Sequence, residues 1–279
     1  VEYIVVKILF FIFKIIGYKN SSNLGFLIGK YFGPLFRSKS LIKNNLIQAN
    51  ISDKNNFDLI ATNVLGNYGR IFSEYVFLKD FRNEKLANYI SINGQKYLDD
   101  IIKKQKKVVF ISGHFNNFEL MAMQLEKYGV NLTAIYRPLN NIFLNKTMEK
   151  IRTHFICRKQ IKKGRSGSRE LVKNFKEGSS IALMIDQRVR EGISVPFFQK
   201  SCSTTTIPAQ LVKKYECEIV PIYIERKKNH FFEMTVSQPL VFNKSLSIDD
   251  ISVELNKILE KMILKNLDQW IWTHNRWQK

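Results

Sequence analysis

The stretch Val108-Val-Phe-Ile-Ser-Gly-His114-Phe-Asn-Asn-Phe-Glu119-Leu120 predicts a buried strand that ends where a helix begins. Its first four residues are β-branched and aromatic, and Ser112-Gly113 marks the turn after them. Asn116 or Asn117 can cap the helix that follows. A strand that passes directly into a helix is the repeating unit of α/β folds, so the rest of the chain is expected to alternate in the same way.

That expectation holds along the sequence. Strands are predicted at 89–92, 108–111, 132–136, 181–185, 219–224 and 231–236, and helices at 41–47, 57–75, 117–128, 141–155, 168–176 and 206–215. The fold class is therefore α/β, with a mostly parallel mixed sheet flanked by helices on both faces. In such sheets functional groups gather at the carboxyl ends of the strands, and His114, Arg137 and Asp186 each follow a predicted strand.

His114 and Glu119 form the candidate catalytic pair. A neutral imidazole, with an unperturbed pKa of about 6.5, can take a proton from an alcohol and later return it to a leaving group. Glu119 would hold the tautomer and stabilise the imidazolium. Residues five apart on one helix are rotated by about 140°, so His114 is expected in the turn, folded back towards Glu119. The alternative is a strand-end histidine bound to a capping acid, since such a spacing arises by chance in roughly one chain in three.

The N-terminus predicts a membrane-anchoring segment over residues 1–36, followed by a single domain over 37–279. Residues 3–16 are apolar except for Lys7 and Lys14, and a helix of that length spans about 21 Å against a hydrocarbon core of about 30 Å. The two lysines fall on one side and leave a broad apolar face, as in helices that lie in a membrane interface. A signal-peptide core, a core-packing helix and a longer spanning segment are the alternatives.

Composition sets the class of protein. The chain of 279 residues is 45% hydrophobic, which excludes a disordered protein. The three cysteines, Cys157, Cys202 and Cys217, form no Cys-x-x-Cys pair and are expected to be reduced and buried. The histidines lack metal-ligand spacing, so no metal is inferred. A net charge of +20 permits nucleic-acid binding, but anionic lipid, a phosphorylated sugar or an acidic carrier protein fits it at least as well.

Six further motifs follow in the order Tyr136-Arg137-Pro138, Arg152, Asp186-Gln187, Val195-Pro196-Phe197-Phe198, Thr204-Thr205 and Asp268-Gln-Trp-Ile-Trp-Thr-His-Asn-Arg276-Trp277. Together with the stretch from His114 to Glu119, they resemble the late acyltransferases of lipid A biosynthesis, the lauroyl and myristoyl transferases. The resemblance runs from the apolar N-terminus to the last residues. It implies a glycerolipid-acyltransferase-like fold and transfer of a fatty acyl chain from acyl carrier protein to a hydroxyl of a lipid A precursor.

The resemblance also implies a location and roles for residues. The enzyme would work at the cytoplasmic face of the bacterial inner membrane, without a cofactor beyond the acyl carrier protein that donates the chain and without nucleic acid. His114 and Glu119 occupy the positions of the family's histidine and acid, while Asn116 and Phe118 replace a glycine and a tryptophan common inside that motif. Arg152 occupies the position of a functionally required arginine.

Further residues are predicted to stabilise the oxyanion, to bind substrate or to pack in the core. Arg152, or backbone N–H groups near His114, would stabilise the oxyanion, and Arg137, Asn117 and Asp186 are candidate substrate-binding residues. Asp186-Gln187 is expected to organise the cleft and not to react. Lys162, Lys163, Arg165 and Arg169 could hold acceptor phosphates, although a solvated loop is the simpler interpretation. The aromatic residues of 195–198 and the three tryptophans Trp270, Trp272 and Trp277 are expected to pack in the core or at an interface.

Two alternative functions remain open. One is an acyltransferase that uses a phospholipid or another glycolipid as acceptor, and the other is a non-catalytic basic protein that binds a membrane or nucleic acid.

Overall fold

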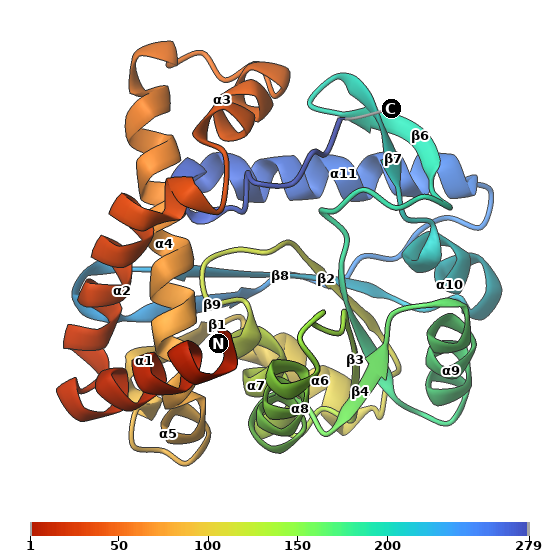
Figure 1. The fold of residues 1–279 in the computed structure, drawn as a ribbon. Coiled ribbons are helices and arrows are strands. Elements are labelled where there is room, and N and C mark those ends of the chain that lie inside the picture. The colour runs from red at the N-terminus through yellow and green to blue at the C-terminus, as the bar shows by residue number, and fades with distance from the viewer. Residues whose placement is uncertain (1, 278–279) are drawn as a thin grey trace.

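Apolar β-forming runs build a sheet through the middle of the computed structural model, which describes residues 2–277 apart from the side chains of Arg165 and Asn229. Within this range seven strands lie in the order β1-β9-β8-β2-β5-β3-β4 (Figure 1). Their bounds are β1 Ile90–Asn93, β2 Val109–Ser112, β3 Leu132–Tyr136, β4 Lys159–Lys162, β5 Ser180–Met184, β8 Ile219–Arg226 and β9 Phe232–Val236.

Most neighbouring strands of the sheet run in parallel. Strands β8, β2, β5, β3 and β4 pair in parallel, β9 runs antiparallel to β8, and β1 pairs in parallel with β9. The predicted mostly parallel mixed sheet is therefore confirmed. All six predicted strands form, whereas β4 was missed because its lysines and glutamine hide the apolar pattern of an edge strand. The carboxyl ends of five parallel strands meet at one edge, and His114 follows one of them.

Helices lie on both faces of this sheet, as predicted (Figure 1). In the view of Figure 1, α11 crosses above the sheet while α6, α7 and α8 lie below it. The predicted helices correspond to α3 Lys39–Gln48, α4 Phe57–Glu74, α7 Glu119–Tyr128, α8 Ile142–Ile151, α9 Arg165–Lys176 and α10 Ile207–Tyr215. Helix α8 ends earlier than predicted because a π-helical turn, Arg152–Ile156, replaces its last residues.

Several elements were not predicted from the sequence. They are the helices α5 Leu78–Arg82, α6 Gln95–Lys103 and α11 Ile248–Lys265, and the antiparallel hairpin of β6 Ile193–Phe197 and β7 Lys200–Thr204. Helix α2 Tyr18–Phe32 lies within the N-terminal segment predicted over residues 1–36. The hairpin explains the aromatic residues at 195–198, since Phe197 is fully buried and stacks on the half-buried Trp277. Trp270 and Trp272 are also buried, which confirms core packing for these two.

The N-terminal helices α1 (Glu2–Ile16) and α2 lie against α4 at one side of the sheet (Figure 1). Helix α2 approaches α4 so closely that a Cβ atom on Gly25 or Gly69 would collide with the backbone of the other helix. Only glycine fits at these two positions. Helix α1 buries Phe13 but leaves a stripe of Ile4, Ile8, Phe11 and Ile15 exposed. No helix within residues 2–277 has both the length and the apolar character needed to cross a membrane.

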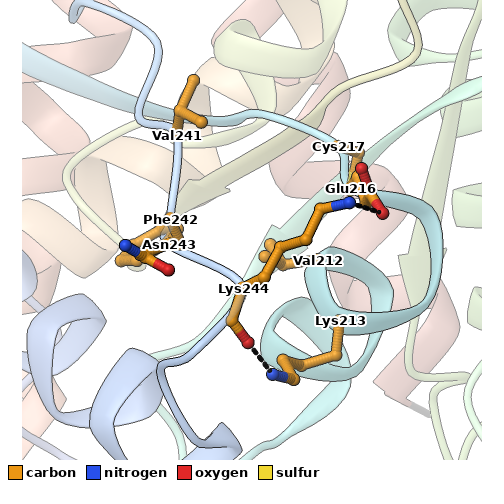
Figure 2. A pocket seen from close by; sticks show the side chains of 8 residues that line it. All are labelled: Val212, Lys213, Glu216, Cys217, Val241, Phe242, Asn243 and Lys244. Atoms are coloured by element: carbon orange, nitrogen blue, oxygen red, sulfur yellow. Dashed lines mark hydrogen bonds and ion pairs between the residues drawn. The ribbon is translucent and has the colours of Figure 1, made fainter.

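A pocket of about 320 Å³ lies beside the beginning of β8 (Figure 2). It is lined by the end of α10 and the segment 241–244, with Cys217 just before β8. Lys213 donates a hydrogen bond to the carbonyl of Lys244 across it (Figure 2). Because β8 runs parallel to β2, a residue that precedes β8 lies at the opposite end of the sheet from His114. This pocket is therefore separate from the candidate active site.

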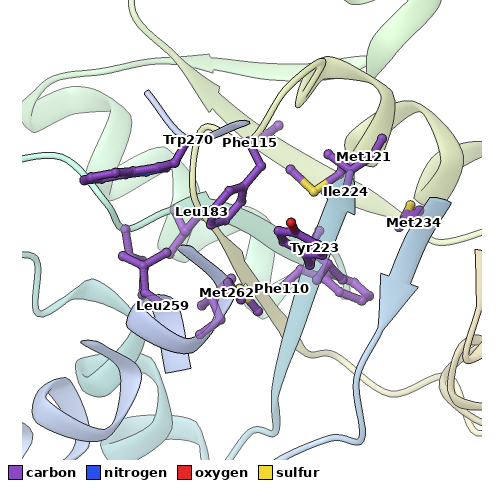
Figure 3. Packing of buried hydrophobic residues seen from close by; sticks show 14 of the residues in the cluster. Phe110, Phe115, Met121, Leu183, Tyr223, Ile224, Met234, Leu259, Met262 and Trp270 are labelled. Atoms are coloured by element: carbon purple, nitrogen blue, oxygen red, sulfur yellow. The ribbon is translucent and has the colours of Figure 1, made fainter. Parts of the chain in front are cut away.

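The hydrophobic core lies on both sides of the central strands, and Figure 3 shows part of it. Phe110 of β2 and Tyr223 of β8 face a layer that includes Leu259 and Met262 of α11 (Figure 3). Every side chain of β2 is buried, as expected for a strand covered by helices on both faces. The three cysteines are free and buried, as predicted. The buried strand gives the residues that follow it a rigid support.

Candidate active site

His114 lies just beyond the end of β2, and its partner is Asp186, just beyond the end of the neighbouring β5. His114 Nδ1 lies 2.8 Å from Asp186 Oδ1, and the backbone N–H of His114 donates to Asp186 Oδ2 at 2.8 Å. Trp270 Nε1 donates to the same Oδ2 at 2.9 Å. Strands β2 and β5 pair in parallel and in register, which brings residues 72 positions apart to the same edge. Asp186 therefore orients the imidazole through Nδ1 and leaves Nε2 free to accept a proton.

Electrostatics support this pairing. Burial by itself lowers the pKa of His114, but the negative charge and hydrogen bond of Asp186 outweigh burial, and Glu119 adds a smaller contribution, so the pKa is raised above 6.5. Burial raises the pKa of Asp186, but the charge and hydrogen bonds of His114, together with Trp270, bring it down to about 2. Asp186 is thus ionised at neutral pH, and the proton between the two groups resides on His114 Nδ1.

The predicted contact between His114 and Glu119 is wrong, because the Glu119 carboxylate binds other residues. Glu119 Oε1 accepts from Arg152 Nε at 3.1 Å and from Nη2 at 3.0 Å, and also from the hydroxyl of Tyr75. Helix α7 begins at Glu119, so this side chain points back over the first turn of the helix towards α4 and the end of α8. Glu119 still lies close enough to raise the pKa of His114 by its charge, after burial and Asp186.

Arg152 is held by this ion pair. Its guanidinium lies 5.7 Å from the centre of the Tyr136 ring, and its Nη1 atom has no hydrogen-bond partner among the described residues. Burial lowers the pKa of Arg152, but the charges of Glu119 and Tyr75 outweigh it and keep the group protonated. One charged donor thus remains without a protein acceptor.

Asn116 and Asn117 hold the loop between His114 and α7, and neither caps the helix. The structure places Phe118 at the cap position without a side-chain hydrogen bond. Asn117, predicted to bind substrate, is fully buried and donates to Glu74 Oε2 at 3.0 Å. Asn116 has φ +39°, a conformation that glycine adopts readily and asparagine tolerates. This geometry accounts for the glycine common at the position of Asn116.

A buried ion pair between Arg226 and Glu74 supports that loop. Arg226 of β8 contacts Glu74 of α4 at 2.7 Å and donates to Asn116 Oδ1 at 3.0 Å. Ser22 of α2 donates to the same carboxylate oxygen, Oε1 of Glu74, at 2.7 Å, and Gln269 accepts from Asn116 Nδ2 at 3.0 Å. Glu74 has no exposed surface. The loop after His114 is therefore fixed to α4, to β8 and to the C-terminal tail, and α2 supports it through Glu74.

Two further residues lie beside His114: Gln187, predicted with Asp186 to organise the cleft, and His274, to which the sequence assigned no role. Gln187 Nε2 is 3.4 Å from both ring nitrogens of His114 and 2.8 Å from His274 Nε2. The rings of His114 and His274 are 6.5 Å apart, while Phe118 packs edge-on against His114 at 4.7 Å. For His274 the signal in the sequence was its place in the C-terminal motif that begins at Asp268.

Positively charged side chains lie near His114 and His274. Burial lowers the pKa of His274, and the charges of His114, Arg37 and Arg137 lower it further. Lys163 likewise opposes the raised pKa of His114. Arg137 is exposed, as a substrate-binding residue would need to be, and Arg37 is exposed as well.

The remaining predicted phosphate ligands lie elsewhere or are not described. Lys162 pairs with Glu149 at 3.3 Å, and Arg169 is exposed on α9. The side chain of Arg165 is outside the described part of the chain.

The chain is similar to several lipid A biosynthesis acyltransferases. The chain is 22% identical over 269 residues to a lipid A biosynthesis acyltransferase from Haemophilus influenzae, covering 90% of this chain and 83% of that protein. It is 23% identical over 206 residues to the lipid A biosynthesis lauroyltransferase of Escherichia coli K12, and 24% identical over 200 residues to the palmitoleoyltransferase of the same organism. Each of these two matches covers 70% of this chain and 64% of the relative, so the chain spans just under two thirds of their length.

Among solved structures, the chain is similar to the 1-acyl-sn-glycerophosphate acyltransferase PlsC of Thermotoga maritima. The similarity covers 94% of this chain and 100% of that chain, with a TM-score of 0.45 and 12% identity. That degree of similarity is too low to support an argument about function. Residues 1–279 match the protein family described as "Bacterial lipid A biosynthesis acyltransferase". Because this match covers the full chain, the protein belongs to the bacterial lipid A biosynthesis acyltransferase family.

Proposed function

We propose that this protein transfers a fatty acyl chain from acyl carrier protein to a hydroxyl of a lipid A precursor. The observation that carries the proposal is the 2.8 Å contact between His114 Nδ1 and Asp186, which directs the free Nε2 away from its carboxylate partner at the functional edge of the sheet. Family membership supports acyl transfer in lipid A biosynthesis. The donor, the acceptor and the role of His114 are parts of the proposal.

The chemistry needs only one base. His114 Nε2 takes the proton from the acceptor hydroxyl while its oxygen attacks the thioester carbonyl carbon and forms the new C–O bond. The tetrahedral intermediate then collapses, the C–S bond breaks, and the imidazolium returns its proton to the leaving thiolate. Asp186 stabilises the imidazolium throughout, as its position against Nδ1 favours the positive charge. No protein nucleophile is required.

Arg152 and Arg137 are proposed to face the substrate. The Nη1 atom of Arg152 is buried and has no acceptor among the described residues, so a substrate oxyanion or phosphate that enters beside it would supply one, while Glu119 holds the guanidinium in place. The exposed Arg137 suits an acceptor phosphate. Asp186, predicted to bind substrate, is instead assigned to His114, since both of its oxygens are already engaged.

The function can be tested in a bacterium that lacks its own late acyltransferase. Expression of the wild-type protein is expected to add one secondary acyl chain to lipid A, detected by mass spectrometry, and His114→Ala is expected to remove that product because the base is lost. Unchanged lipid A, despite proven expression of the wild-type protein, would count against the proposed acceptor. A product made equally well by His114→Ala would count against the mechanism.

The second candidate acceptor is a lysophospholipid or another glycolipid. Purified protein supplied with labelled acyl carrier protein and each acceptor in turn separates these possibilities. Labelling of lysophospholipid but not of the lipid A precursor would reject the first choice and retain the enzyme. Failure with every acceptor would favour the non-catalytic alternative, a basic protein that binds a membrane or nucleic acid.

We also propose that residues 1–36 anchor the enzyme to the cytoplasmic face of the inner membrane. The exposed stripe on α1 includes Phe11, 68% exposed, and Ile8, 55% exposed, with Lys7 exposed beside it. Lys14, predicted to face headgroups, instead pairs with Asp80 within the protein. A helix with this distribution binds in a membrane interface and does not need to cross it.

Replacing Ile8 and Phe11 together by serine is expected to weaken binding to vesicles of phosphatidylethanolamine and phosphatidylglycerol by about 10-fold per residue, since each loses the burial of one large apolar side chain. Sedimentation of the purified variants with vesicles measures the effect. The matched control is Val241→Ser, because Val241 is 79% exposed and lies beside the pocket at the end of α10, away from α1. Equal binding of the double variant and the wild-type protein would reject this anchor.

A further inference from the structure

Gln187 is a second polar side chain, after Asp186, that the structure places against the His114 ring. Its amide nitrogen is equally distant, at 3.4 Å, from Nδ1 and Nε2. Asp186 is the closer partner of Nδ1, at 2.8 Å, whereas the two equal, longer contacts place Gln187 beside the ring and not in line with either ring nitrogen. A hydroxyl bound at Nε2 would have Gln187 as a neighbour.

The orientation of Gln187 is set by His274. Gln187 Nε2 lies 2.8 Å from His274 Nε2, so one amide hydrogen is donated there. An amide nitrogen carries two hydrogens, and the second remains available for an oxygen near His114. His274 is itself held in place, since Asn45 of α3 donates to the carbonyls of Trp272 and His274, each at 2.6 Å.

We propose that Gln187 is a catalytic residue that donates this second amide hydrogen to the thioester carbonyl oxygen, and that His274 is the residue that positions it. The inference rests on the proposed acyl transfer. When the acceptor oxygen attacks, the carbonyl π electrons move onto oxygen, and a preorganised N–H at that point stabilises the negative charge. When the C–S bond breaks, the electron pair on this oxygen re-forms the C=O bond, and the negative charge leaves on the thiolate, which His114 protonates. Gln187 exchanges no proton in this cycle.

Arg152 is a less direct candidate for the same task. Two of its three guanidinium nitrogens are bound by Glu119, and its known contacts lie towards Tyr75 and Tyr136. Gln187, by contrast, touches the base itself and follows Asp186 directly in the chain. The second and third residues after β5 thus serve two parts of one reaction, with Asp186 on the imidazole and Gln187 on the carbonyl oxygen.

The test compares Gln187→Met, which keeps the length of the side chain but removes both amide hydrogens, with the wild-type enzyme. Loss of one oxyanion donor is expected to reduce kcat by about 100- to 1,000-fold, with little change in the KM for acyl carrier protein. The acid side of the pH–rate profile should stay in place, because His114 keeps Asp186. The control is Gln210→Met, since Gln210 is exposed on α10.

His274 provides the second measurement. His274→Ala is expected to reduce kcat by less than Gln187→Met, and His274→Gln should restore part of the rate because its side-chain oxygen can accept the same hydrogen bond. A wild-type rate in Gln187→Met, a loss confined to KM, or a rate loss accompanied by a moved acid limb would overturn the inference.

The assay must separate this inference from the proposed acceptor. The Gln187 variants are therefore compared with whichever acceptor the wild-type enzyme acylates. If the wild-type protein acylates lysophospholipid but not the lipid A precursor, the proposed acceptor fails while the Gln187 test proceeds unchanged. If the wild-type protein breaks no thioester at all, both fail together, and retention of full activity in Gln187→Met overturns the inference alone.

Discussion

Replacing Asp186 by asparagine is expected to lower kcat for acyl transfer by about 100- to 10,000-fold, the usual contribution of a general base. The reason lies in the donors around the carboxylate. Oδ2 accepts from the backbone N–H of His114 and from Trp270 Nε1, so this position must stay an oxygen. The amide nitrogen would then face Nδ1, favour the tautomer protonated on Nε2, and remove the base. Steady-state kinetics with labelled acyl carrier protein measure the loss.

The pH dependence gives the same test a second readout. The base must be neutral to act, and the pKa of His114 lies above 6.5, so the wild-type rate should fall as the pH drops through a value above 6.5. Without the charge of Asp186, burial dominates and lowers that pKa, so any remaining activity should persist to lower pH in Asp186→Asn.

Glu119→Gln provides the matched comparison for the identity of the partner. Its charge adds the smaller contribution to His114, so the acid limb should move less than in Asp186→Asn. The overall rate can still fall, because Arg152 loses its ion-pair partner. An acid limb that moves with Glu119→Gln and stays in place with Asp186→Asn would contradict the assignment of Asp186 and restore the pair predicted from the sequence.

Replacing Arg226 by methionine is expected to reduce the free energy of unfolding by about 3–5 kcal/mol, because Glu74 would remain buried without its cation. Glu74 is fully buried, and the Arg226 side chain is 8% exposed. Burial lowers the pKa of Arg226, but the charge of Glu74 outweighs it and raises the value, which indicates a charged pair. Denaturant titration followed by circular dichroism measures the change.

The double variant Glu74→Leu with Arg226→Met tests the cause. Removing both charges is expected to recover much of the stability lost in either single variant, since no unpaired charge remains. Lys257→Met serves as a control because Lys257 forms a surface pair with Glu254 and should leave stability unchanged within error. A double variant less stable than Arg226→Met would show that packing, and not charge, explains the loss.

The secondary structure could be predicted where local patterns are strong. The run Val108–Ile111 is apolar on both faces because β2 is covered on both sides, and α4 repeats apolar residues at helical spacing. Strand β4 and the β6–β7 hairpin escaped prediction because their exposed positions carry polar residues that break the pattern. Helix α11 was not predicted, although its sequence carries apolar residues at helical spacing over 18 residues.

The position of His114 followed from local sequence, but its partner did not. The few residues before His114 form a buried strand, so local sequence is enough to place its imidazole at the carboxyl end of that strand. Glu119 was the nearest acid along the chain, whereas Asp186 is 72 residues away. Their contact depends on the parallel register of β2 with β5, which pairs Ser112 with Met184. Sequence distance therefore favoured the wrong acid.

The same reason accounts for the other partners of the site. Local sequence specified a strand, a turn, a histidine and an amphipathic N-terminal helix, because short-range periodicity and turn chemistry suffice for these features. The contacts of Glu119 with Arg152, of Asn117 with Glu74 and of Gln187 with His274 join segments separated by 33, 43 and 87 positions. Packing of helices onto the sheet selects among many possible acid, amide and base pairs, and that selection is made by long-range contacts that no local pattern encodes.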